Sequence, residues 1–491
     1  MTDSLRRNYN AKTTGASPVS LTKRFACIAA GALLLTLAAC GGDVTPSSQS
    51  ATSPTTPQTS PTSPPAAPSN PAAPSTPSAS TFTVGGTVAG MPSGVSLQLS
   101  NGSSDAVTIS ANGSFAFPTA LSSGATYSVT VAVQPAGETC VVTSGGGVVA
   151  ASNVTTIAVN CEQTEFALVP NRADGTTSVY RIDPTTGALN PVPGSPFPTG
   201  SEPNDITVSG NIAYIAQLGS NTVQGFAINP STGSLTALAG AVAVGLAPAS
   251  IVSDLSGKFV YVADTGSDAV TTLSIDPTTH ALTIIGTTII GDVPTALAIS
   301  PTGQSLYVGD WNSNSVSSFT INAATGALTA APGSPSFVGS QPVAIAVAPS
   351  GQYVYTILSG GNEVAMQSAD PSTGQLGLSS FWVGAGLSSM AIAPSGKFAY
   401  AGEISGNTIQ TFDFLPTNGF LMSTGIQISS GSEAEHITID PTGRWLYAPT
   451  VSGTIAAFAI DANTGALTAV PGSQVPTGNG PTTLIVARPV P

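Results

Sequence analysis

Histidine is so rare in this chain that any chemistry depending on it can be located at once. The sequence contains two, His280 and His436. His436 directly follows Glu435, and Glu433 lies two residues before Glu435. An imidazole beside carboxylates can act as a general base or acid and activate water against a carbonyl group. We therefore take His436, Glu435 and the upstream Glu403 as catalytic candidates. The alternative is that they are polar residues at loop ends with no chemical role.

Two acidic loops carry oxygen-bearing side chains at alternate positions, as calcium loops do. They are Asp264-Thr-Gly-Ser-Asp268 and Asp310-Trp-Asn-Ser-Asn314. Asp, Asn and Gly are equally typical of hairpin turns, for backbone reasons, and neither loop matches a complete EF-hand pattern. We expect no cofactor and no other metal, with calcium left open.

The elements that position these residues repeat along the chain. A heptapeptide of the type Asp-Pro-x-Thr-Gly-x-Leu returns seven times, at intervals of 45 to 48 residues. The seven copies begin at Asp183, Asn229, Asp276, Asn322, Asp370, Leu415 and Asp461. A period in the forties, in a sequence rich in β-branched residues, is typical of a propeller blade. The sequence therefore predicts an all-β fold whose main part, residues 163–491, is a seven-bladed β-propeller.

Each repeat predicts four strands. An inner strand such as residues 342–347 is followed by a second strand that begins at an aromatic residue. These aromatic residues are Tyr214, Tyr261, Tyr307, Tyr355, Tyr400 and Tyr447, with Phe166 in the first repeat. A third strand and a short outer strand complete the blade. The last segment, residues 481–487, is an inner strand with no successors. We expect it to complete the first blade beside residues 166–169, so that no sheet edge is left open.

Sorting residues by their place in the repeat gathers acidic groups on the face usually used for ligands. Arg172 is the clear cation among them, and Trp311 is an aromatic side chain able to anchor a partner. The carboxylates are Asp174, Glu202, Asp205, Asp264, Asp268, Asp292, Asp310, Glu363, Glu403, Glu433 and Glu435. We expect Arg172, Asp310, Trp311 and Glu433 to contact a ligand. Anionic ligands usually require Arg or Lys clamps, so the prediction is an unidentified protein, a carbohydrate or a neutral small molecule.

Three motifs stand out in the repeats: Tyr-Val-Ala-Asp or Tyr-Val-Gly-Asp in the second strand, Asn-Thr-Val in the third strand, and the heptapeptide. Together they resemble the lactonase-type seven-bladed propellers with YVTN repeats, a superfamily that includes the 6-phosphogluconolactonases. Members resembling 6-phosphogluconolactonases carry a Gly-Pro-Arg-His segment at an inner strand, followed in the next turn by an Asn-Glu pair. His436 falls where that histidine would be, whereas Glu435 replaces the arginine. Thr450 stands in the segment that would carry Asn-Glu, and Glu403 has a similar position one blade earlier.

The N-terminus predicts export. Basic residues precede an apolar stretch from Phe25 to Ala39, which reads as a secretory signal over residues 1–39. Leu-Ala-Ala-Cys40 looks like a bacterial lipobox, which makes Cys40 the expected lipidated residue and the outer membrane of the cell envelope the expected location. Residues 40–80, rich in Pro, Ser and Thr, predict a disordered tether. Cleavage would leave six Lys and Arg against 23 Asp and Glu, which disfavours nucleic acid as a partner.

Residues 81–162 predict a separate, small immunoglobulin-like antiparallel β-sandwich, because seven short alternating segments lie between Gly, Ser and Asn turns. Cys140 and Cys161 lie within it, in a context of export that permits disulfides. The close Cys-x-x-Cys spacing of a redox or metal pair is absent from the sequence. We predict that these two cysteines form a disulfide.

Together these features favour a membrane-tethered binding or scaffolding lipoprotein that uses the acidic face of a propeller. The alternative is a lactone hydrolase with a non-standard active site, in which His436 and a nearby carboxylate exchange protons.

Overall fold

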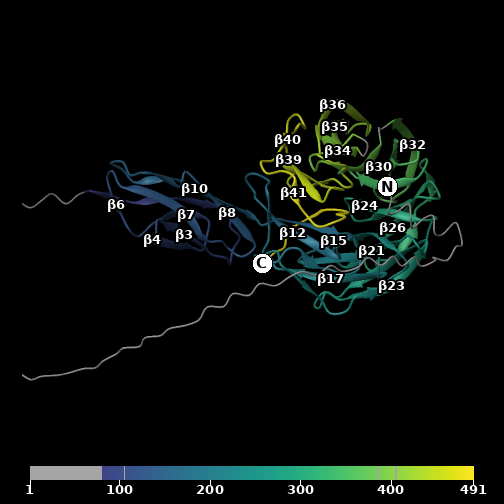
Figure 1. The fold of residues 1–491 in the computed structure, drawn as a ribbon, viewed down its shortest axis with the longest axis horizontal. Coiled ribbons are helices and arrows are strands. Elements are labelled where there is room, and N and C mark those ends of the chain that lie inside the picture. The colour runs from purple at the N-terminus through teal and green to yellow at the C-terminus, as the bar shows by residue number, and fades with distance from the viewer. Residues whose placement is uncertain (1–79, 104, 384–385, 404–405, 491) are drawn as a thin grey trace, which may run out of the picture. The chain divides into compact units, whose positions relative to one another are not determined.

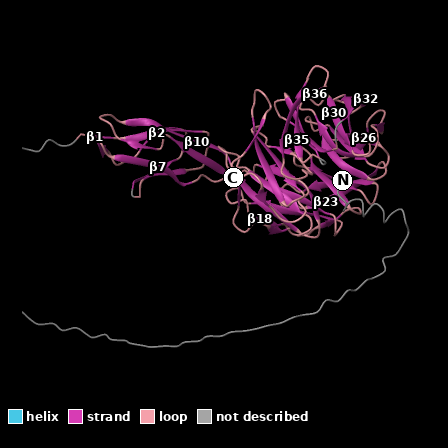
Figure 2. Cartoon of the chain, turned by 45° about the horizontal axis from the view of Figure 1, so that its top comes forward, coloured by secondary structure: helices cyan, strands magenta, loops and turns pink. Residues whose placement is uncertain are grey.

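The computed structural model describes residues 80–490, apart from residues 104, 384–385 and 404–405. The predicted signal sequence, Cys40 and the tether lie outside the described residues. The described part is built from strands and contains no helix (Figure 2). It therefore offers no helical segment with the length and apolar character needed to span a bilayer.

Residues 81–163 form the small sandwich. One sheet has the strand order β5-β2-β10-β8 and the other β4-β3-β7-β9, with β1 and β6 paired at the edge. The strands are β1 (Thr81–Phe82), β2 (Val84–Ala89), β3 (Leu97–Asn101), β4 (Asp105–Ile109), β5 (Gly113–Ala116), β6 (Leu121–Ser122), β7 (Thr126–Val133), β8 (Glu138–Thr143), β9 (Gly146–Val148) and β10 (Val154–Gln163). The sandwich is not wholly antiparallel as predicted, since β10 pairs with β2 in parallel. Cys140 and Cys161 face each other across β8 and β10 and form the predicted disulfide.

Seven four-stranded sheets follow, and each carries the predicted order of inner, second, third and outer strand. The inner strands are β15 (Pro203–Ser209), β20 (Pro248–Ser253), β24 (Pro294–Ile299), β29 (Pro342–Val347), β33 (Leu387–Ile392), β37 (Thr438–Ile439) and β42 (Ile485–Ala487). The second strands are β11 (Phe166–Asn171), β16 (Ile212–Gln217), β21 (Phe259–Asp264), β25 (Ser305–Asp310), β30 (Tyr353–Leu358), β34 (Phe398–Glu403) and β38 (Trp445–Thr450). Most residues of the second strands are fully buried, because they lie between neighbouring sheets.

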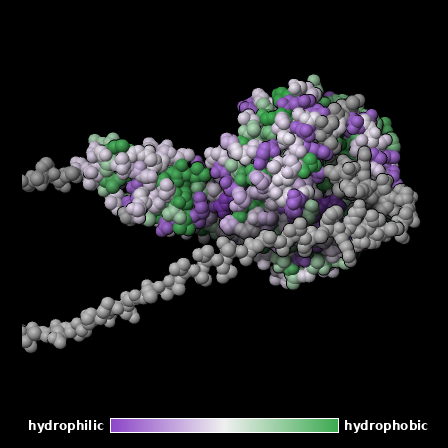
Figure 3. All heavy atoms as spheres, viewed as in Figure 1, coloured by the Kyte–Doolittle hydropathy of each residue, from purple (hydrophilic) through white to green (hydrophobic). Residues whose placement is uncertain are grey.

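The outer half of each blade is more variable. The third strands are β12 (Thr176–Ile182), β17 (Thr222–Ile228), β22 (Ala269–Ile275), β26 (Ser315–Ile321), β31 (Glu363–Ala369), β35 (Thr408–Phe414) and β39 (Thr454–Ile460). The outer strands are β13 (Leu189–Pro191), β18 (Leu235–Ala237), β23 (Leu282–Ile289), β27 (Leu328–Ala330), β32 (Leu376–Val383), β36 (Leu421–Ser429) and β40 (Leu467–Ala469). Four blades add a short extra strand, namely β14 (Phe197–Pro198), β19 (Val242–Ala243), β28 (Ser336–Phe337) and β41 (Val475–Pro476). Apolar and polar residues are interspersed over the visible surface (Figure 3).

The C-terminal strand closes the ring as predicted. β42 pairs with β11 over Leu168↔Ile485 to Phe166↔Ala487, so the first blade is β42-β11-β12-β13. The last blade then packs directly on the first, and Figure 1 shows β39 and β41 beside β12. Side chains of both blades, such as Tyr180 and Tyr447, share one buried cluster. Closure therefore buries both ends of the propeller sequence in the same region.

The heptapeptide is a turn that also fastens two blades together. In the last copy, the Asp461 carboxylate accepts hydrogen bonds from the backbone N–H groups of Asn463 and Thr464. Gly465 has a φ of 69°, a conformation that glycine adopts without penalty. The preceding blade then covers this turn: the hydroxyl of Tyr400 donates to the Gly465 carbonyl at 2.9 Å, and the ring of Phe398 lies against the glycine.

The same contact recurs around the ring and corrects one detail of the predicted repeat. The second strands begin two residues before the tyrosines, at positions such as Phe398. Phe166 corresponds to these first residues, because it packs on Gly233 of the next heptapeptide, and Leu168 occupies the tyrosine position of the first blade. The other tyrosine-to-turn bonds are Tyr214 to His280, Tyr261 to Gly326, Tyr355 to Gly419 and Tyr447 to Gly187.

Candidate functional site

The last residue of each second strand occupies one repeated position, and in most blades it holds the hairpin that follows. These residues are Asn171, Gln217, Asp264, Asp310, Leu358, Glu403 and Thr450. One Asp310 oxygen accepts hydrogen bonds from Ser317 at 2.6 Å and from Ser315 at 3.2 Å. Asp310 is fully buried, so its predicted role in contacting a ligand is wrong. Its side chain accepts the hydroxyl hydrogen bonds of the hairpin instead.

Glu403 occupies the same repeated position and behaves in a similar way. Its Oε2 atom accepts a hydrogen bond from the Thr408 hydroxyl at 2.6 Å and one from the Gln410 amide at 3.4 Å. These donors belong to β35 of its own blade. The geometry therefore gives Glu403 the hairpin role of Asp310, and no hydrogen bond joins it to His436 among the described residues.

Each inner strand carries one extra residue at its second position, where the pairing register shifts. The shift is seen directly in five blades, between Pro203 and Asp205 for example. The residues at this bulge position are Asn204, Ala249, Thr295, Val343 and Ser388, with Glu435 and Thr482 at the matching places of the two remaining blades. Such bulges re-aim a side chain away from the ladder. Glu435 is the one ionisable residue in this ring of seven.

Most polar members of this ring bind the backbone of the next blade. Asn204 donates to the Ala249 carbonyl, Thr295 to that of Pro342 and Ser388 to that of Ala434. Among the described residues the Glu435 side chain makes no such bond, so Glu435 breaks the pattern. Its segment is also irregular: Ala434 forms an isolated bridge with Thr450, and regular pairing resumes only at Thr438.

The environment of Glu435 favours its neutral form. Burial and the nearby Glu433 carboxylate raise the pKa of Glu435 to about 7, against a smaller opposing effect of Arg172. A carboxyl group with this pKa can take up a proton and release it at neutral pH, which is what a general base requires. Glu433 and Arg172 therefore lie close enough to Glu435 to affect its pKa.

Arg172 reaches this site from the first blade. Its backbone N–H donates to the Gly480 carbonyl at 2.8 Å, which ties the β11–β12 hairpin to the chain that enters the last inner strand. Its guanidinium forms an ion pair with the Glu202 carboxylate at 3.2 Å. The side chain of Arg172 is only 14% exposed, whereas that of Glu202 is 48% exposed. Glu202 thus holds Arg172 in place, a partnership that the sequence did not reveal.

His436 is held in a defined tautomer. Its Nδ1 lies 3.2 Å from the Thr438 hydroxyl, and that hydroxyl lies 2.6 Å from the Leu484 carbonyl, to which it must donate its single proton. Nδ1 therefore carries a proton and donates to Thr438, leaving Nε2 as an acceptor. Burial lowers the pKa of His436 to about 4, so the ring is neutral at neutral pH. The histidine is suited to orient a hydroxyl group or water rather than to remove a proton.

The remaining candidate, Trp311, lies elsewhere. It occupies the position in the fourth blade that Arg172 occupies in the first, and its backbone N–H donates to the Val293 carbonyl at 2.9 Å. The ring is partly buried. Arg172 and Glu433 affect the pKa of Glu435 where the seventh blade meets the first, and His436 follows Glu435 directly in the chain. We call these four residues the closure site; Trp311, in the fourth blade, is not part of it. Among the described residues, no three His, Cys, Asp or Glu side chains are grouped closely enough to hold a metal ion.

A family of known proteins matches the sequence over most of its length. The profile described as "Lactonase, 7-bladed beta-propeller" matches residues 137–252, 163–344 and 345–482. The chain belongs to this lactonase family. The match confirms the resemblance and the blade number expected from the heptapeptides. A comparison with curated proteins gave no match.

Solved structures share the fold of this chain. A proposed 6-phosphogluconolactonase from Bacteroides fragilis is 21% identical, with a TM-score of 0.59 over 66% of this chain and 98% of its own. A second one, from Bacteroides uniformis, is 18% identical with the same TM-score over 66% of this chain and all of its own. A periplasmic gluconolactonase from Pseudomonas aeruginosa is 18% identical, with a TM-score of 0.56 over 67% of this chain and all of its own. At these identities the likeness concerns the fold alone.

Proposed function

We propose that this member of the lactonase family hydrolyses a lactone that carries no phosphate or carboxylate group, and that Glu435 is the general base. The observation that carries this proposal is a carboxyl group with a pKa of about 7, set at an irregular inner strand beside the one arginine of the closure site. Of the two functions considered from the sequence, family membership favours the hydrolase over the binding scaffold.

The closure site contains the groups that lactone hydrolysis needs. Glu435 as carboxylate removes a proton from water while the water oxygen attacks the lactone carbonyl carbon. The carbonyl oxygen becomes an oxyanion, and the Arg172 guanidinium supplies the positive charge that stabilises it. The ring C–O bond then breaks, and the proton on Glu435 passes to the departing ring oxygen, giving the open hydroxy acid. His436, neutral and accepting through Nε2, orients the water or a substrate hydroxyl.

The charges of the site support an uncharged substrate. Arg172 is already paired with Glu202, and Glu433 and Glu435 add two acidic groups. A phosphorylated lactone would meet more like charges than opposite ones, without a free cation to clamp it. A lactone of a neutral sugar avoids this repulsion and can use its hydroxyl groups as hydrogen-bond donors to the carboxylates.

The test compares two residues at the same bulge position. Glu435→Gln keeps the side-chain shape and removes the base, so kcat/KM for gluconolactone should fall by about 100-fold or more. Thr295→Val alters the equivalent residue of the fourth blade, and its activity should equal that of the unaltered protein. Rates are measured by acid release, with the spontaneous rate subtracted. Full activity in the Glu435→Gln variant would refute the assigned base.

The cellular setting stays a prediction. Export, the lipid on Cys40 and an outer-membrane location depend on residues outside the described part of the chain. If they hold, the enzyme acts on lactones that reach the cell envelope. Labelling with a radioactive fatty acid should mark the unaltered chain and not a Cys40→Ala variant.

A further inference from the structure

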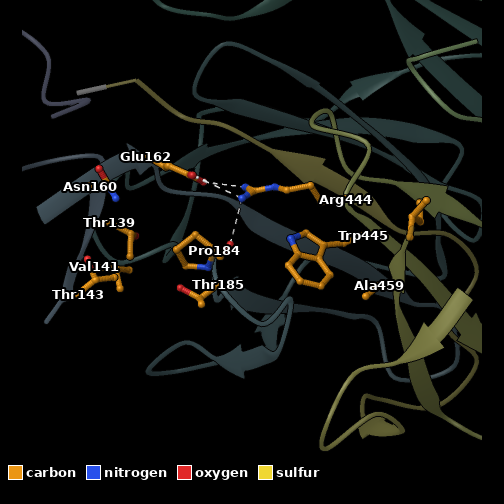
Figure 4. Close-up of a pocket in the computed structure, with 11 residues that line it drawn as sticks. Thr139, Val141, Thr143, Asn160, Glu162, Pro184, Thr185, Arg444, Trp445 and Ala459 are labelled. Atoms are coloured by element: carbon orange, nitrogen blue, oxygen red, sulfur yellow. Dashed lines mark hydrogen bonds and ion pairs between the residues drawn. The ribbon is translucent and has the colours of Figure 1, made fainter. Parts of the chain in front are cut away.

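A cavity of about 490 Å³ lies at the opposite end of strand β38 from the closure site (Figure 4). Thr450, which ends β38, pairs with Ala434 beside the closure site, whereas Trp445, which begins the strand, lines the cavity. The two ends of this six-residue strand are five steps apart, roughly 16 Å at the usual rise per residue. The cavity is within the size range of small-molecule sites, and it is independent of the chemistry proposed above.

Trp445 presents a polar edge to this cavity. The indole is 8% exposed, and its Cε3 edge packs against Gly187, where an added Cβ would lie 2.4 Å from Cε3. Nε1 is on the other edge of the ring and makes no hydrogen bond to any described residue. A buried donor without an acceptor costs about 1–3 kcal/mol. A ligand that offers an acceptor at this point recovers that free energy.

The repeat shows that the indole nitrogen is not needed for packing. The first residue of the second strand covers the glycine of the next heptapeptide in every comparable blade. At this place the neighbouring blades have Phe166 and Phe398, which pack on Gly233 and Gly465. A phenyl ring is therefore sufficient for the structural contact. The tryptophan adds an N–H group and a larger apolar face, both directed toward the cavity.

The charged groups at the cavity neutralise each other. The Arg444 guanidinium forms an ion pair with Glu162 at 2.7 Å and donates to the Pro184 carbonyl at 3.2 Å (Figure 4). The two side chains are 39% and 48% exposed, so they keep capacity for further hydrogen bonds. A charged ligand would have to compete with this pair, whereas a neutral ligand with hydroxyl groups can bond to both members.

The rest of the lining combines apolar surface with hydroxyl and amide groups. Val141 and Ala459 supply apolar contacts, and Thr139, Thr185 and Asn160 supply polar ones. From this combination we infer that the cavity binds a neutral saccharide. The C–H face of a sugar ring packs on the indole, and one sugar oxygen accepts the hydrogen bond from Nε1. Its hydroxyl groups bond to the Arg444–Glu162 pair.

The experiment replaces Trp445 with phenylalanine, the residue found at this position in both neighbouring blades. Trp445→Phe keeps the contact with Gly187 and removes the N–H group. Calorimetric titration with glucose, N-acetylglucosamine, maltose and cellobiose should show saturable binding of at least one of them to the unaltered protein. Glucose 6-phosphate should bind more weakly than glucose. The variant should bind the same sugar about 5-fold or more weakly, the factor expected for one lost hydrogen bond, and its thermal unfolding should stay cooperative.

Activity separates this inference from the proposed function. Trp445→Phe should hydrolyse gluconolactone at the unaltered rate, and Glu435→Gln should bind the saccharide with unaltered affinity. Sugar binding that persists at full strength in Trp445→Phe overturns the inference, as does the absence of saturable binding by all four sugars. Equal binding of glucose and glucose 6-phosphate also overturns it, because the site would then not select neutral ligands.

Discussion

Five blades have an inner strand of six or seven residues, whereas the two blades that meet at the closure have inner strands of two and three residues. In the regular blades the bulge residue is apolar or neutral, and three of these side chains bind the next blade. In the seventh blade the same position holds Glu435, in a segment that leaves the ladder between Ala434 and Thr438. The repeat thus provides a scaffold, and the chemical groups gather where the repeat is least regular.

The closure should be the most sensitive region of the propeller. Removing residues 481–491 deletes β42, whose partner β11 is buried throughout, and leaves the first blade with an exposed edge. We expect loss of the cooperative thermal transition, because the deletion removes more than the few kcal/mol by which such domains are stable. Circular dichroism melts and limited proteolysis measure this.

A shorter truncation supplies the control. Ending the chain after Pro489 removes the two hydrogen bonds between Val490 and Asn211 but leaves β42 intact. Its melting temperature should fall by only a few degrees. If the longer truncation melts in the same way, closure by β42 is not what holds the ring together.

Among the regular blades, the buried aspartates should make the protein more stable in mild acid. Burial raises the pKa of Asp264 and Asp310 to about 6. Since both values lie above those of the unfolded chain, the folded state binds more protons, and stability increases as pH falls from above 6 to about 4. Asp310→Asn should therefore raise stability at pH 7.5 by about 2 kcal/mol and have little effect at pH 4.

Asparagine is compatible with this position, because Asn171 occupies the same repeated position in the first blade and is also fully buried. Urea denaturation at both pH values gives the comparison. A destabilisation at pH 7.5 would mean that the charged carboxylate contributes more to its hairpin than burial opposes.

Each hydrogen bond from a tyrosine hydroxyl to a heptapeptide carbonyl of the next blade should contribute a smaller, similar amount to the free energy of unfolding. Tyr400→Phe removes the hydrogen bond to the Gly465 carbonyl and should lower the free energy of unfolding by about 1 kcal/mol. Tyr307→Phe is the matched control, because the hydroxyl of Tyr307 makes no such bond to a heptapeptide carbonyl among the described residues. Equal losses in the two variants would show that the phenol matters for its packing alone.

The smallest effect concerns the tuning of Glu435. Glu433 raises the pKa of Glu435, so Glu433→Gln should lower it and move the rising limb of the pH–rate profile to more acidic pH by less than one unit. The maximal rate should change little. A profile that keeps its position would remove Glu433 from the electrostatic description of the closure site.

Much of the fold could be predicted because it depends on local turn chemistry. Each heptapeptide specifies its turn locally. In the last copy, Asp461 accepts hydrogen bonds from two backbone N–H groups, and Gly465 has a positive φ. Their count gave seven blades, and the leftover segment at the C-terminus gave the closure. The error at Phe166 arose because aromatic character alone cannot distinguish two positions of one strand, whereas the contact with Gly233 can.

The candidate site could be predicted only in part, because it depends on relations between blades. His436 could be selected because the chain has only two histidines, and Glu435 because it is the residue next to His436. Asp310 was misplaced because the sequence does not show that the ends of second strands turn inward to hydroxyl groups such as that of Ser317. Glu435 can be recognised as the one ionisable residue at the bulge position only when the seven inner strands are aligned by their pairing register.

The tyrosine-to-heptapeptide bonds between blades also determine the order in which the blades can be completed during synthesis. Each blade is held by a heptapeptide that belongs to the next blade, and 65 residues separate Tyr400 from its partner Gly465, so a newly made blade has to wait for most of the next one. The first blade waits longest, because its inner strand is the final piece of the chain. A ribosome that delivers this protein from its N- to its C-terminus therefore releases an open array of blades, and synthesis ends in a single ring-closing event.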